Sequence, residues 1–542
     1  MTEQQLVALV DSMSVEQLCG QVLVPHLGVN TPPEEIEAML KRVQPGGIFM
    51  NNHTPERMRL YTEIANKYCV APCCVAGDIE GSLGGAVAGE TNVPRAMAWG
   101  ACDDPKLIEK LGRQIAVRAR RLGFHWTFAP VVDLNMNPNN PITGCRAISD
   151  DAATVARIAG AWVKGMRRGG LMAVACKHFP GDGTDDRNQH FLTSVNSLSY
   201  PRWLRTYGRV YKKMFALGAD SVMVAHIALP SYTGENAAYG ALSGSLNPKL
   251  MVDLLRGELG FTGLIVSDAM SMIGAAAAVP IERLSIEFFK AGGDVVLFPE
   301  RHDKERLIAA VTSGEIPPER LKASVLRFLR MKNALRLFEN QEEIVKKLPR
   351  AADVPAIAQE IAERSIKFVR DTAGILPLKL TPGAKILMIN QFPSVNMLGK
   401  AQQGGDKPFV LLKAELEARG YAVFAHNLPT YEQIQVIMQE KYDCVLINLR
   451  FDPMNYHGGS LRLSWEHVIA FWRAYALQNP LTVLTSFGDP YKLYEFPYIK
   501  TYVNAFDACD ASVKAFVRVL LGEIPARAKN PVTLKGFFNR GE

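Results

Sequence analysis

Residues 177 to 190, KHFPGDGTDDRNQH, concentrate reactive side chains in a short stretch that directly follows the apolar run Leu171 to Cys176. Two histidines, a lysine, an arginine, three aspartates and two glycines lie within it. Imidazole exchanges protons near neutral pH, and carboxylates serve as nucleophiles, general bases or metal ligands. So many polar groups at the end of an apparently buried strand predict a functional site.

Three places in the chain supply the candidate catalytic groups. Asp268 follows the buried run Leu264 to Val266, where it could be a nucleophile, a general base, a metal ligand or a helix cap. Lys177 and His178 are neighbours, and neighbours on a strand point to opposite faces, so both can face one site only where the strand bends or ends. His190 lies in a glycine-containing loop that can fold over such a site.

Short apolar runs alternate with amphipathic stretches up to about residue 345, which is typical of repeated βα units and a parallel sheet. One helix is marked by apolar residues from Val155 to Met166 at helical spacing, and it stops at Gly169-Gly170. Eight strands are predicted: Gln21 to Pro25, Gly47 to Met50, Cys74 to Asp78, Trp126 to Val132, Ala173 to His178, Ser221 to His226, Leu264 to Asp268 and Asp294 to Phe298.

Polar residues follow most of these strands, including Asp78, Glu80, Asp133, His226 and Asp268. Active sites of (β/α)8 barrels lie at the carboxyl ends of the strands. The pattern therefore predicts an α/β fold in which a (β/α)8 TIM-like barrel carries the site. Eight parallel runs could also form an open, doubly wound sheet.

A second α/β sandwich domain is predicted after a charged, helical connector. We assign residues 1–340 to the barrel, 341–358 to the linker and 359–542 to the second domain. Its strands are predicted at Ala384 to Asn390, Ala422 to Ala425, Cys444 to Asn448, Leu481 to Ser486 and Tyr502 to Ala505, with a helix at Trp465 to Ala476. The pair Gly458-Gly459 reads as a turn and is too weak to indicate a phosphate loop.

Composition excludes several classes of protein. The net charge of +7 is small for 542 residues, and the basic residues are scattered among acidic ones, which argues against nucleic-acid binding. The N-terminus does not resemble a signal peptide, and no apolar run is long enough to span a bilayer. Nine dispersed cysteines without metal-site spacing favour a reducing, cytoplasmic setting.

Several motifs together resemble glycoside hydrolase family 3, and most closely its β-N-acetylglucosaminidase branch. They are Lys177-His-Phe-Pro-Gly181 with His190 downstream, Val266-Ser-Asp-Ala-Met270, Val222-Met-Val-Ala-His226, Phe128-Ala-Pro-Val-Val-Asp133, Asn140-Pro-Ile-Thr-Gly-Cys-Arg146 and Ala291-Gly-Gly-Asp294. Glu363-Arg-Ser-Ile366 and Gly374-Ile-Leu-Pro-Leu378 are similar to the start of that family's second domain. The likeness spans most of residues 1 to 525.

The resemblance implies a retaining exo-glycosidase acting on a carbohydrate partner without a metal or cofactor. Asp268 matches the family nucleophile, and His190 matches the branch's acid/base, which replaces the usual second carboxylate. Asp78, Arg146, Lys177 and His178 match positions that hydrogen-bond the terminal sugar. The small Ala269 before Met270, where β-glucosidases of the family place a tryptophan, leaves room for a 2-acetamido group. A monomer and a homodimer are both open.

Two positions depart from the branch. Asn188 stands where an aspartate usually supports the catalytic histidine, and the segment after Asp78 lacks an arginine that binds sugar. The orienting role could instead fall to Asp185 or Asp186.

Alternatives therefore stay open: a β-glucosidase or β-xylosidase, a β-glycoside phosphorylase, and a catalytically weak or silent sugar-binding protein. From residue types alone, a metal-dependent hydrolase built on His178, His190, His226 and Asp268 is a further possibility.

Overall fold

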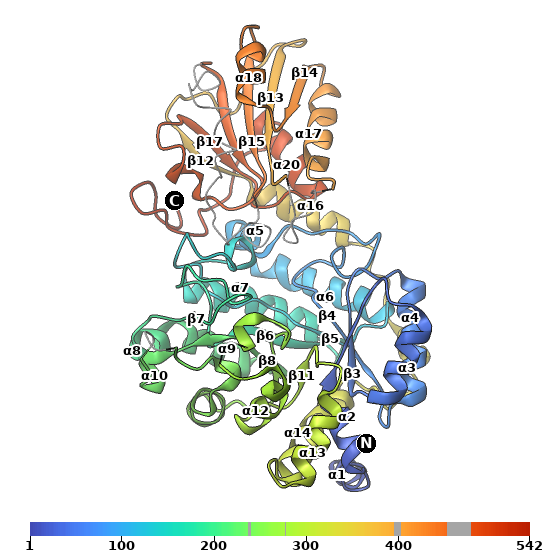
Figure 1. The fold of residues 1–542 in the computed structure, drawn as a ribbon. Helices are drawn as coiled ribbons and strands as arrows, with labels where there is room; N and C mark the ends of the chain where they lie inside the picture. The colour runs from blue at the N-terminus through green and yellow to red at the C-terminus, as the bar shows by residue number, and fades with distance from the viewer. Residues whose placement is uncertain (237–239, 277, 395–402, 452–478) are drawn as a thin grey trace. The chain divides into compact units, whose positions relative to one another are not determined.

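The computed structural model describes residues 1–236, 240–276, 278–394, 403–451 and 479–542. The chain forms two compact units (Figure 1). The first comprises Met1–Thr91, Pro105–Leu134 and Val155–Val354, and the second comprises Asn92–Asp104, Asn135–Thr154 and Pro355–Glu542. Within the described ranges, no helix is both long and apolar enough to cross a membrane.

Parallel strands form a closed ring in the first unit. Seven strands are hydrogen-bonded in the order β10-β8-β6-β5-β4-β3-β2. The ring closes because β1, just before β2 in the chain, pairs with β11, and Val295 beside β11 bridges to Val266 of β10. The bounds are β1 (Leu23–Val24), β2 (His26–Leu27), β3 (Gly47–Met50), β4 (Cys74–Gly77), β5 (Trp126–Thr127), β6 (Ala173–Phe179), β8 (Ser221–Val224), β10 (Leu264–Ser267) and β11 (Val296–Leu297), with a separate short pair of β7 (Ser194–Val195) and β9 (Ile227–Ala228).

The predicted barrel is thus confirmed, and the open doubly wound sheet is not formed. Since β1 and β2 share one position in the ring, eight strand positions surround the core. The predicted strand at Trp126 to Val132 is shorter in the structure, because only Trp126 and Thr127 keep regular pairing. The cis peptide bond between Ala129 and Pro130 lies just after it.

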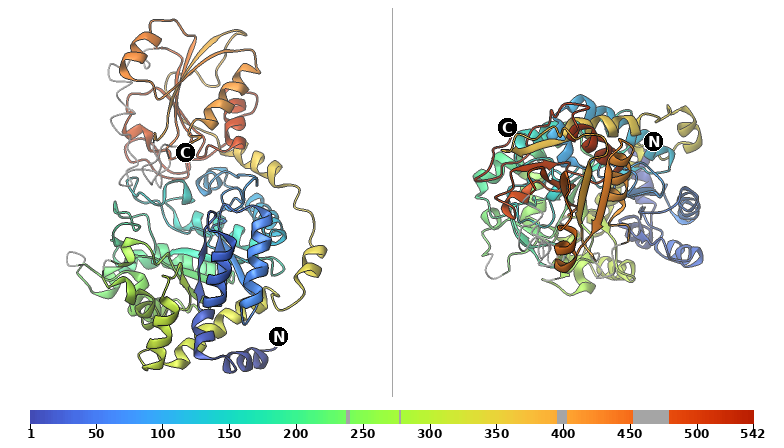
Figure 2. Two further views of the ribbon diagram at one scale, coloured as in Figure 1. Left: turned by 45° about the vertical axis from the view of Figure 1, so that its right-hand side comes forward. Right: turned by 90° about the horizontal axis from the view of Figure 1, so that it is seen from above.

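Helices lie outside these strands, and α3 packs against α4 on the outer surface (Figures 1 and 2). The predicted helix with apolar residues from Val155 to Met166 is α7, and Gly169 and Gly170 after it have φ of 73° and 70°. The bounds are α1 (Glu3–Asp11), α2 (Val15–Gln21), α3 (Pro33–Val43), α4 (Pro55–Tyr68), α6 (Pro105–Arg121), α7 (Ala152–Arg167), α8 (Tyr200–Trp203), η2 (Leu204–Gly208), α9 (Arg209–Ala216), α10 (Pro230–Thr233), η4 (Gly244–Leu246), η5 (Lys249–Glu258), α11 (Ile273–Ala276), η6 (Ile281–Arg283), α12 (Leu284–Lys290), α13 (Asp303–Thr312), α14 (Pro318–Ala334) and α15 (Gln341–Lys347).

Side chains fill the interior of the barrel. Phe49 of β3 stacks on Phe128, and Trp126 of β5 contacts Phe128 edge-on. The cluster also takes buried residues from β1, β4, β6, β8 and β10. Such filling makes the barrel a packed core, so substrate chemistry must take place at its rim.

The second unit contains a six-stranded sheet in the order β12-β17-β16-β15-β13-β14, with only β12 antiparallel. Buried apolar clusters cover both faces, and one includes Met97 and Cys145 from the two earlier segments. The strands are β12 (Lys367–Asp371), β13 (Lys385–Gln391), β14 (Ala422–Asn427), β15 (Cys444–Leu449), β16 (Thr482–Ser486) and β17 (Thr501–Asn504), and the helices are α5 (Ala96–Cys102), η1 (Gly144–Arg146), α16 (Val354–Ser365), α17 (Lys407–Glu417), α18 (Tyr431–Ile437), η11 (Tyr491–Tyr494) and α20 (Asp510–Leu520).

The five strands predicted for this unit are found, and β12 is an edge strand that the sequence did not reveal. The helix predicted at Trp465 to Ala476 and the turn predicted at Gly458-Gly459 lie outside the described residues. The domain boundaries at residues 340 and 358 stay a prediction.

Candidate active site

Lys177, near the carboxyl end of β6, is held between two carboxylates that follow β4. Its ammonium nitrogen lies 2.9 Å from Oδ1 of Asp78 and 2.7 Å from Oε1 of Glu80. The lysine side chain is buried, whereas the two carboxylates are partly exposed. A buried ammonium group requires such pairing to stay charged. The structure therefore brings Asp78 and Lys177 together and adds Glu80 to them.

His178 is oriented by Asp133, which follows β5. Its Nδ1 lies 2.6 Å from Oδ2 of Asp133. The other carboxylate oxygen accepts main-chain hydrogen bonds from His178 and Asp182, at 3.1 and 2.8 Å. Because an ionised carboxylate can only accept, Nδ1 of His178 carries a proton, and the ring is fixed relative to the backbone of its own loop.

Asp268 stands at the end of β10, and its main-chain nitrogen donates to Val224 O at 2.9 Å. Burial opposes ionisation of its carboxyl, but the charges of His178 and His226, the Ala269 amide and Lys177 outweigh burial. The pKa of Asp268 is therefore lowered from its usual value. At neutral pH the group is a carboxylate, the form that a nucleophile requires.

His226, after β8, holds the turn that follows Asp268. Its Nε2 lies 3.2 Å from the carbonyl oxygen of Ala269, and its Nδ1 lies 2.8 Å from Oγ of Ser245. A carbonyl only accepts, so Nε2 carries the proton and donates it to this bond. Burial lowers the pKa of His226 despite the nearby Asp268. The ring thus acts as a fixed donor that positions the segment following Asp268.

Asn188 contacts His190 directly. Its Oδ1 lies 3.0 Å from the main-chain nitrogen of His190 and 2.8 Å from the ring Nδ1. Because the main-chain N–H can only donate, the amide must present its oxygen here, and Nδ1 must also donate. Nε2 is then the ring nitrogen that the predicted acid/base role would use. The contacts of the Asp185 carboxylate include Arg187 and the main chain of Val195, so that group anchors the loop.

The His190 loop is attached to the segment that follows Asp268. The main-chain nitrogen of Ile273 donates to His190 O at 3.1 Å, and Oγ1 of Thr193 lies 3.4 Å from Gly274 O. The approach at Gly274 is so close that a Cβ there would lie 2.2 Å from Gln189 O. The candidate nucleophile and the candidate acid/base are therefore carried by two directly bonded segments.

Arg146 is the one predicted site residue outside the first unit. It ends η1, on the Asn135–Thr154 segment of the second unit. The turn before it is shaped by Asn140, whose Oδ1 accepts hydrogen bonds from the main chains of Ile142 and Thr143 at 3.0 and 2.8 Å. Its contact with a sugar stays a prediction.

Among the described parts of the chain, no group of three or more histidine, cysteine, aspartate or glutamate side chains is arranged to hold a metal ion. Instead, Nδ1 of His178 contacts Asp133, and Nδ1 of His226 contacts Ser245.

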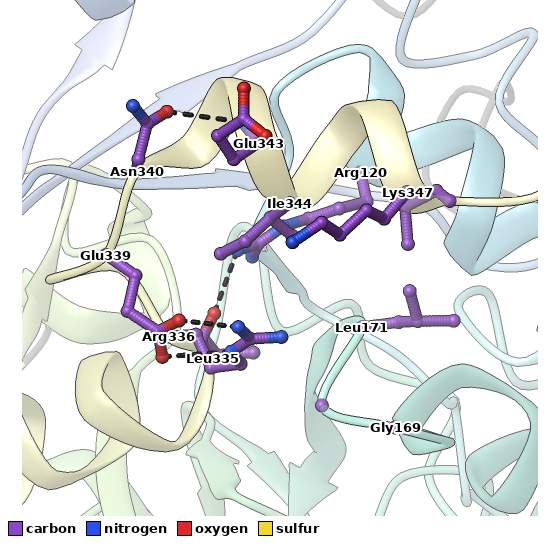
Figure 3. Close-up of a pocket in the computed structure, with 12 residues that line it drawn as sticks. Arg120, Gly169, Leu171, Leu335, Arg336, Glu339, Asn340, Glu343, Ile344 and Lys347 are labelled. Atoms are coloured by element: carbon purple, nitrogen blue, oxygen red, sulfur yellow. Dashed lines mark hydrogen bonds and ion pairs between the residues drawn. The ribbon is translucent and has the colours of Figure 1, made fainter.

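A cavity of about 350 Å³ lies away from these residues, between α15 and the turns that end α7 and α14 (Figure 3). Arg120 lines it, and its Nη2 donates to Leu335 O at 2.8 Å and to Oε1 of Gln341 at 2.7 Å. Arg336 pairs with Glu339 beside it. No predicted site residue is in its lining, and these contacts fasten the connector helix to the barrel.

The sequence motifs missed the supporting roles of Glu80 and Asp133. In the sequence both acids follow predicted strands, which is the signal that could have assigned them. The need for glycine at position 274 had no such signal, because it arises from a contact between segments distant in the sequence.

Comparison with known proteins agrees with this geometry. Residues 14–331 match the glycosyl hydrolase family 3 N terminal domain. A β-N-acetylglucosaminidase/β-glucosidase from Cellulomonas fimi is 31% identical, over 96% of this chain and 94% of that relative. A β-hexosaminidase from Methylobacillus flagellatus is 26% identical, over 56% of this chain and 86% of its own length. The solved structure of a β-glucoside phosphorylase is 28% identical with a TM-score of 0.86, covering 98% of this chain and 97% of that one.

The family match covers more than half of the chain, and the barrel places an ionised aspartate and a histidine on bonded segments at its rim. The protein is therefore a glycosidase that belongs to glycoside hydrolase family 3.

Proposed function

We propose that the protein is a retaining exo-glycosidase that removes non-reducing terminal β-linked N-acetylglucosamine from glycans or cell-wall fragments. The observation that carries this proposal is the Asn188–His190 contact, on a loop bonded to the segment that follows an ionised Asp268. One group is a carboxylate nucleophile, and the other is an imidazole whose tautomer leaves Nε2 to exchange protons. Retaining glycosidases need these two roles in one site.

In the first step, the Asp268 carboxylate attacks the anomeric carbon while the bond to the leaving oxygen breaks. His190 Nε2 gives its proton to that oxygen, which leaves as an alcohol. In the second step, water passes a proton to Nε2, and its oxygen attacks the anomeric carbon. The bond to Asp268 breaks, and the carboxylate is regenerated. Asp78, Lys177, His178 and Arg146 are proposed to bind the hydroxyls of the terminal sugar.

The N-acetylated sugar is proposed on two grounds. The small Ala269 beside the nucleophile leaves room for a 2-acetamido group, and the similar protein from C. fimi is named a β-N-acetylglucosaminidase/β-glucosidase and that from M. flagellatus a β-hexosaminidase. The first of those names also includes β-glucosidase. Glucosides and xylosides therefore belong in the same substrate panel.

The direct test is release of 4-nitrophenol from the N-acetyl-β-D-glucosaminide, β-D-glucoside and β-D-xyloside by the purified chain, with Asp268→Ala as the control. We expect the highest kcat/KM on the first substrate. Absence of turnover on all three, in wild type and in Asn188→Asp, would contradict the proposal and favour a sugar-binding protein without activity.

Phosphorolysis is the second candidate. The side chain that contacts the His190 ring at position 188 is an uncharged amide, which repels an anionic acceptor less than a carboxylate there would. The similar solved structure is named as a phosphorylase. Incubation with and without inorganic phosphate separates the two reactions, because a phosphorylase releases the sugar as its 1-phosphate and a hydrolase releases the free sugar.

We further propose a reducing compartment such as the cytoplasm. All nine cysteines are described, and each is a free thiol.

A further inference from the structure

Three large apolar side chains are exposed beside His190. Phe191 and Leu192 follow it directly and are 50% and 53% exposed. Ile273, whose main-chain nitrogen donates to His190 O, is 61% exposed. We call these three residues the apolar platform. Single exposed apolar residues are ordinary, but a group on two bonded segments at the rim of a site marks an interaction surface.

The loop inverts the usual distribution of polar and apolar residues. Gln189 is 1% exposed, and its Oε1 has no hydrogen-bond partner among the residues that the structure describes. Phe191 and Leu192, which follow His190, face solvent. Burying the amide and exposing the two apolar groups costs free energy in the unliganded protein. A bound molecule that covers the platform would recover part of it.

The position of the platform identifies the part of a substrate that would cover it. Under the proposed function, on which this inference rests, His190 Nε2 protonates the oxygen of the leaving group. Atoms beyond that oxygen lie on the leaving-group side of the site, whereas the hydroxyl-binding residues Asp78 and Lys177 lie at the ends of β4 and β6. Exposed residues adjoining His190 are therefore candidates to contact the leaving group.

We propose that Phe191, Leu192 and Ile273 form a binding subsite for the leaving group and select aglycones that present an apolar face. Two chemical classes fit, namely a second pyranose ring, whose axial C–H groups form such a face, and an aromatic ring. A small alkyl group leaves the platform uncovered.

The test compares ethyl and cyclohexyl glycosides of N-acetyl-β-D-glucosamine. Their leaving alcohols are similar in acidity, so the ratio of kcat/KM reports contact with the aglycone. We expect the wild type to have a higher kcat/KM on the cyclohexyl glycoside than on the ethyl glycoside. In the double variant Phe191→Ser, Leu192→Ser, this ratio of kcat/KM values should fall by about ten-fold. Ile273→Ser on the other segment should lower the ratio as well. Phe191→Tyr should keep it.

Leu60→Ser is the matched control, since Leu60 is 41% exposed on α4 and distant in sequence from the site. We expect it to leave the ratio unchanged. The inference would be overturned if the double variant and Ile273→Ser both kept the wild-type ratio. A change in oligomeric state without a change in ratio would also overturn it. A disaccharide and a phenyl glycoside then decide which of the two ring classes is preferred.

Failure of the proposed function gives a different result. If no glycoside is turned over, calorimetry compares the binding of N-acetylglucosamine with that of its β-1,4-linked disaccharide. A gain in affinity from the second ring that disappears in the double variant supports the subsite. No gain, or a gain that the variant retains, overturns it.

Discussion

The side-chain oxygen of Asn188 accepts two hydrogen bonds from His190, one from the main chain at 3.0 Å and one from the ring Nδ1 at 2.8 Å. The main-chain donor fixes the amide orientation, and the amide oxygen fixes the tautomer. An aspartate would give the same geometry and would also stabilise the imidazolium by its charge. Asn188 thus preserves the orientation of His190 without the charge.

Asn188→Asp should move the alkaline limb of the pH profile of kcat/KM to higher pH. A carboxylate at this position favours the protonated ring, which is the proposed proton donor of the first step. We expect a shift of about one pH unit. The measurement is the pH dependence of kcat/KM on an alkyl glycoside, whose poor leaving group needs protonation. An alkaline limb at the same pH in the wild type and in Asn188→Asp would argue against His190 as the proton donor.

Asn188→Ala removes the orienting acceptor and should lower kcat/KM on the alkyl glycoside by about 100-fold. A 2,4-dinitrophenyl glycoside, which departs without protonation, should lose far less in the first step. Equal losses on the two substrates would indicate a general structural defect.

Asp268→Ala should reduce turnover by on the order of 10⁴- to 10⁶-fold, the effect of removing a nucleophile. Added azide should then restore activity on the 2,4-dinitrophenyl glycoside and give the α-glycosyl azide. NMR identifies the anomer. A β-configured product would show that another group forms the covalent intermediate.

The acid limb of kcat/KM should not lie above about pH 4, the ordinary range of an aspartate. The pKa of Asp268 is lowered, because neighbouring positive charges and the Ala269 amide outweigh burial. The carboxylate therefore persists as pH falls, and activity is lost only when pH passes below that lowered value. Circular dichroism over the same range separates this limb from unfolding. An acid limb near pH 6 would indicate that a group other than Asp268 is the nucleophile.

Gly274→Ala should reduce kcat/KM by about ten-fold or more, because misplacement of a catalytic group by about 1 Å is costly. The new Cβ would lie 2.2 Å from Gln189 O and 2.9 Å from Leu192 O, so it must displace the His190 loop. Gly257→Ala is the control, since its nearest atom is Val252 O at 3.4 Å. Equal kcat/KM values for the two variants would show that the His190 loop can move to accommodate the new Cβ without loss of activity.

Asp133→Asn should weaken sugar binding through His178. An amide that keeps its oxygen toward the two main-chain donors presents its NH₂ group to Nδ1, which reverses the tautomer of the ring. We expect kcat/KM to fall by about 10- to 100-fold, mostly through KM. Asp133→Ala should also lower Tm, because leaving a buried donor unpaired costs about 1–3 kcal/mol. An unchanged KM in Asp133→Asn would place His178 outside the sugar site.

Much of the barrel could be predicted because its signals are local. The strand Gly47–Met50 is bounded by turns and buried throughout, and its predicted limits agree with the structure. The end of α7 follows from two glycines with positive φ. The strand β12 escaped prediction because its residues are only half-buried at the edge of a sheet and lack a continuous apolar run.

The candidate site was predictable in its residue types but not in its pairings. Position at a strand end indicated Asp78, Lys177 and Asp268, since barrel topology brings those ends together. The partners of Lys177 and His178 depend on side-chain distances across strands, which spacing along the chain does not determine. Whether Asn188 could replace an aspartate likewise depended on its distance from the His190 ring.

The bond from Ile273 to His190 also has a mechanical consequence. It joins the stretch that begins at Asp268 to the loop that carries His190. Any swing of that loop wide enough to let a departing alcohol escape must either break this bond or pull Ile273 along with it. Under the proposed mechanism, we therefore expect release of the first product and the second attack to depend on the same bonded pair of segments.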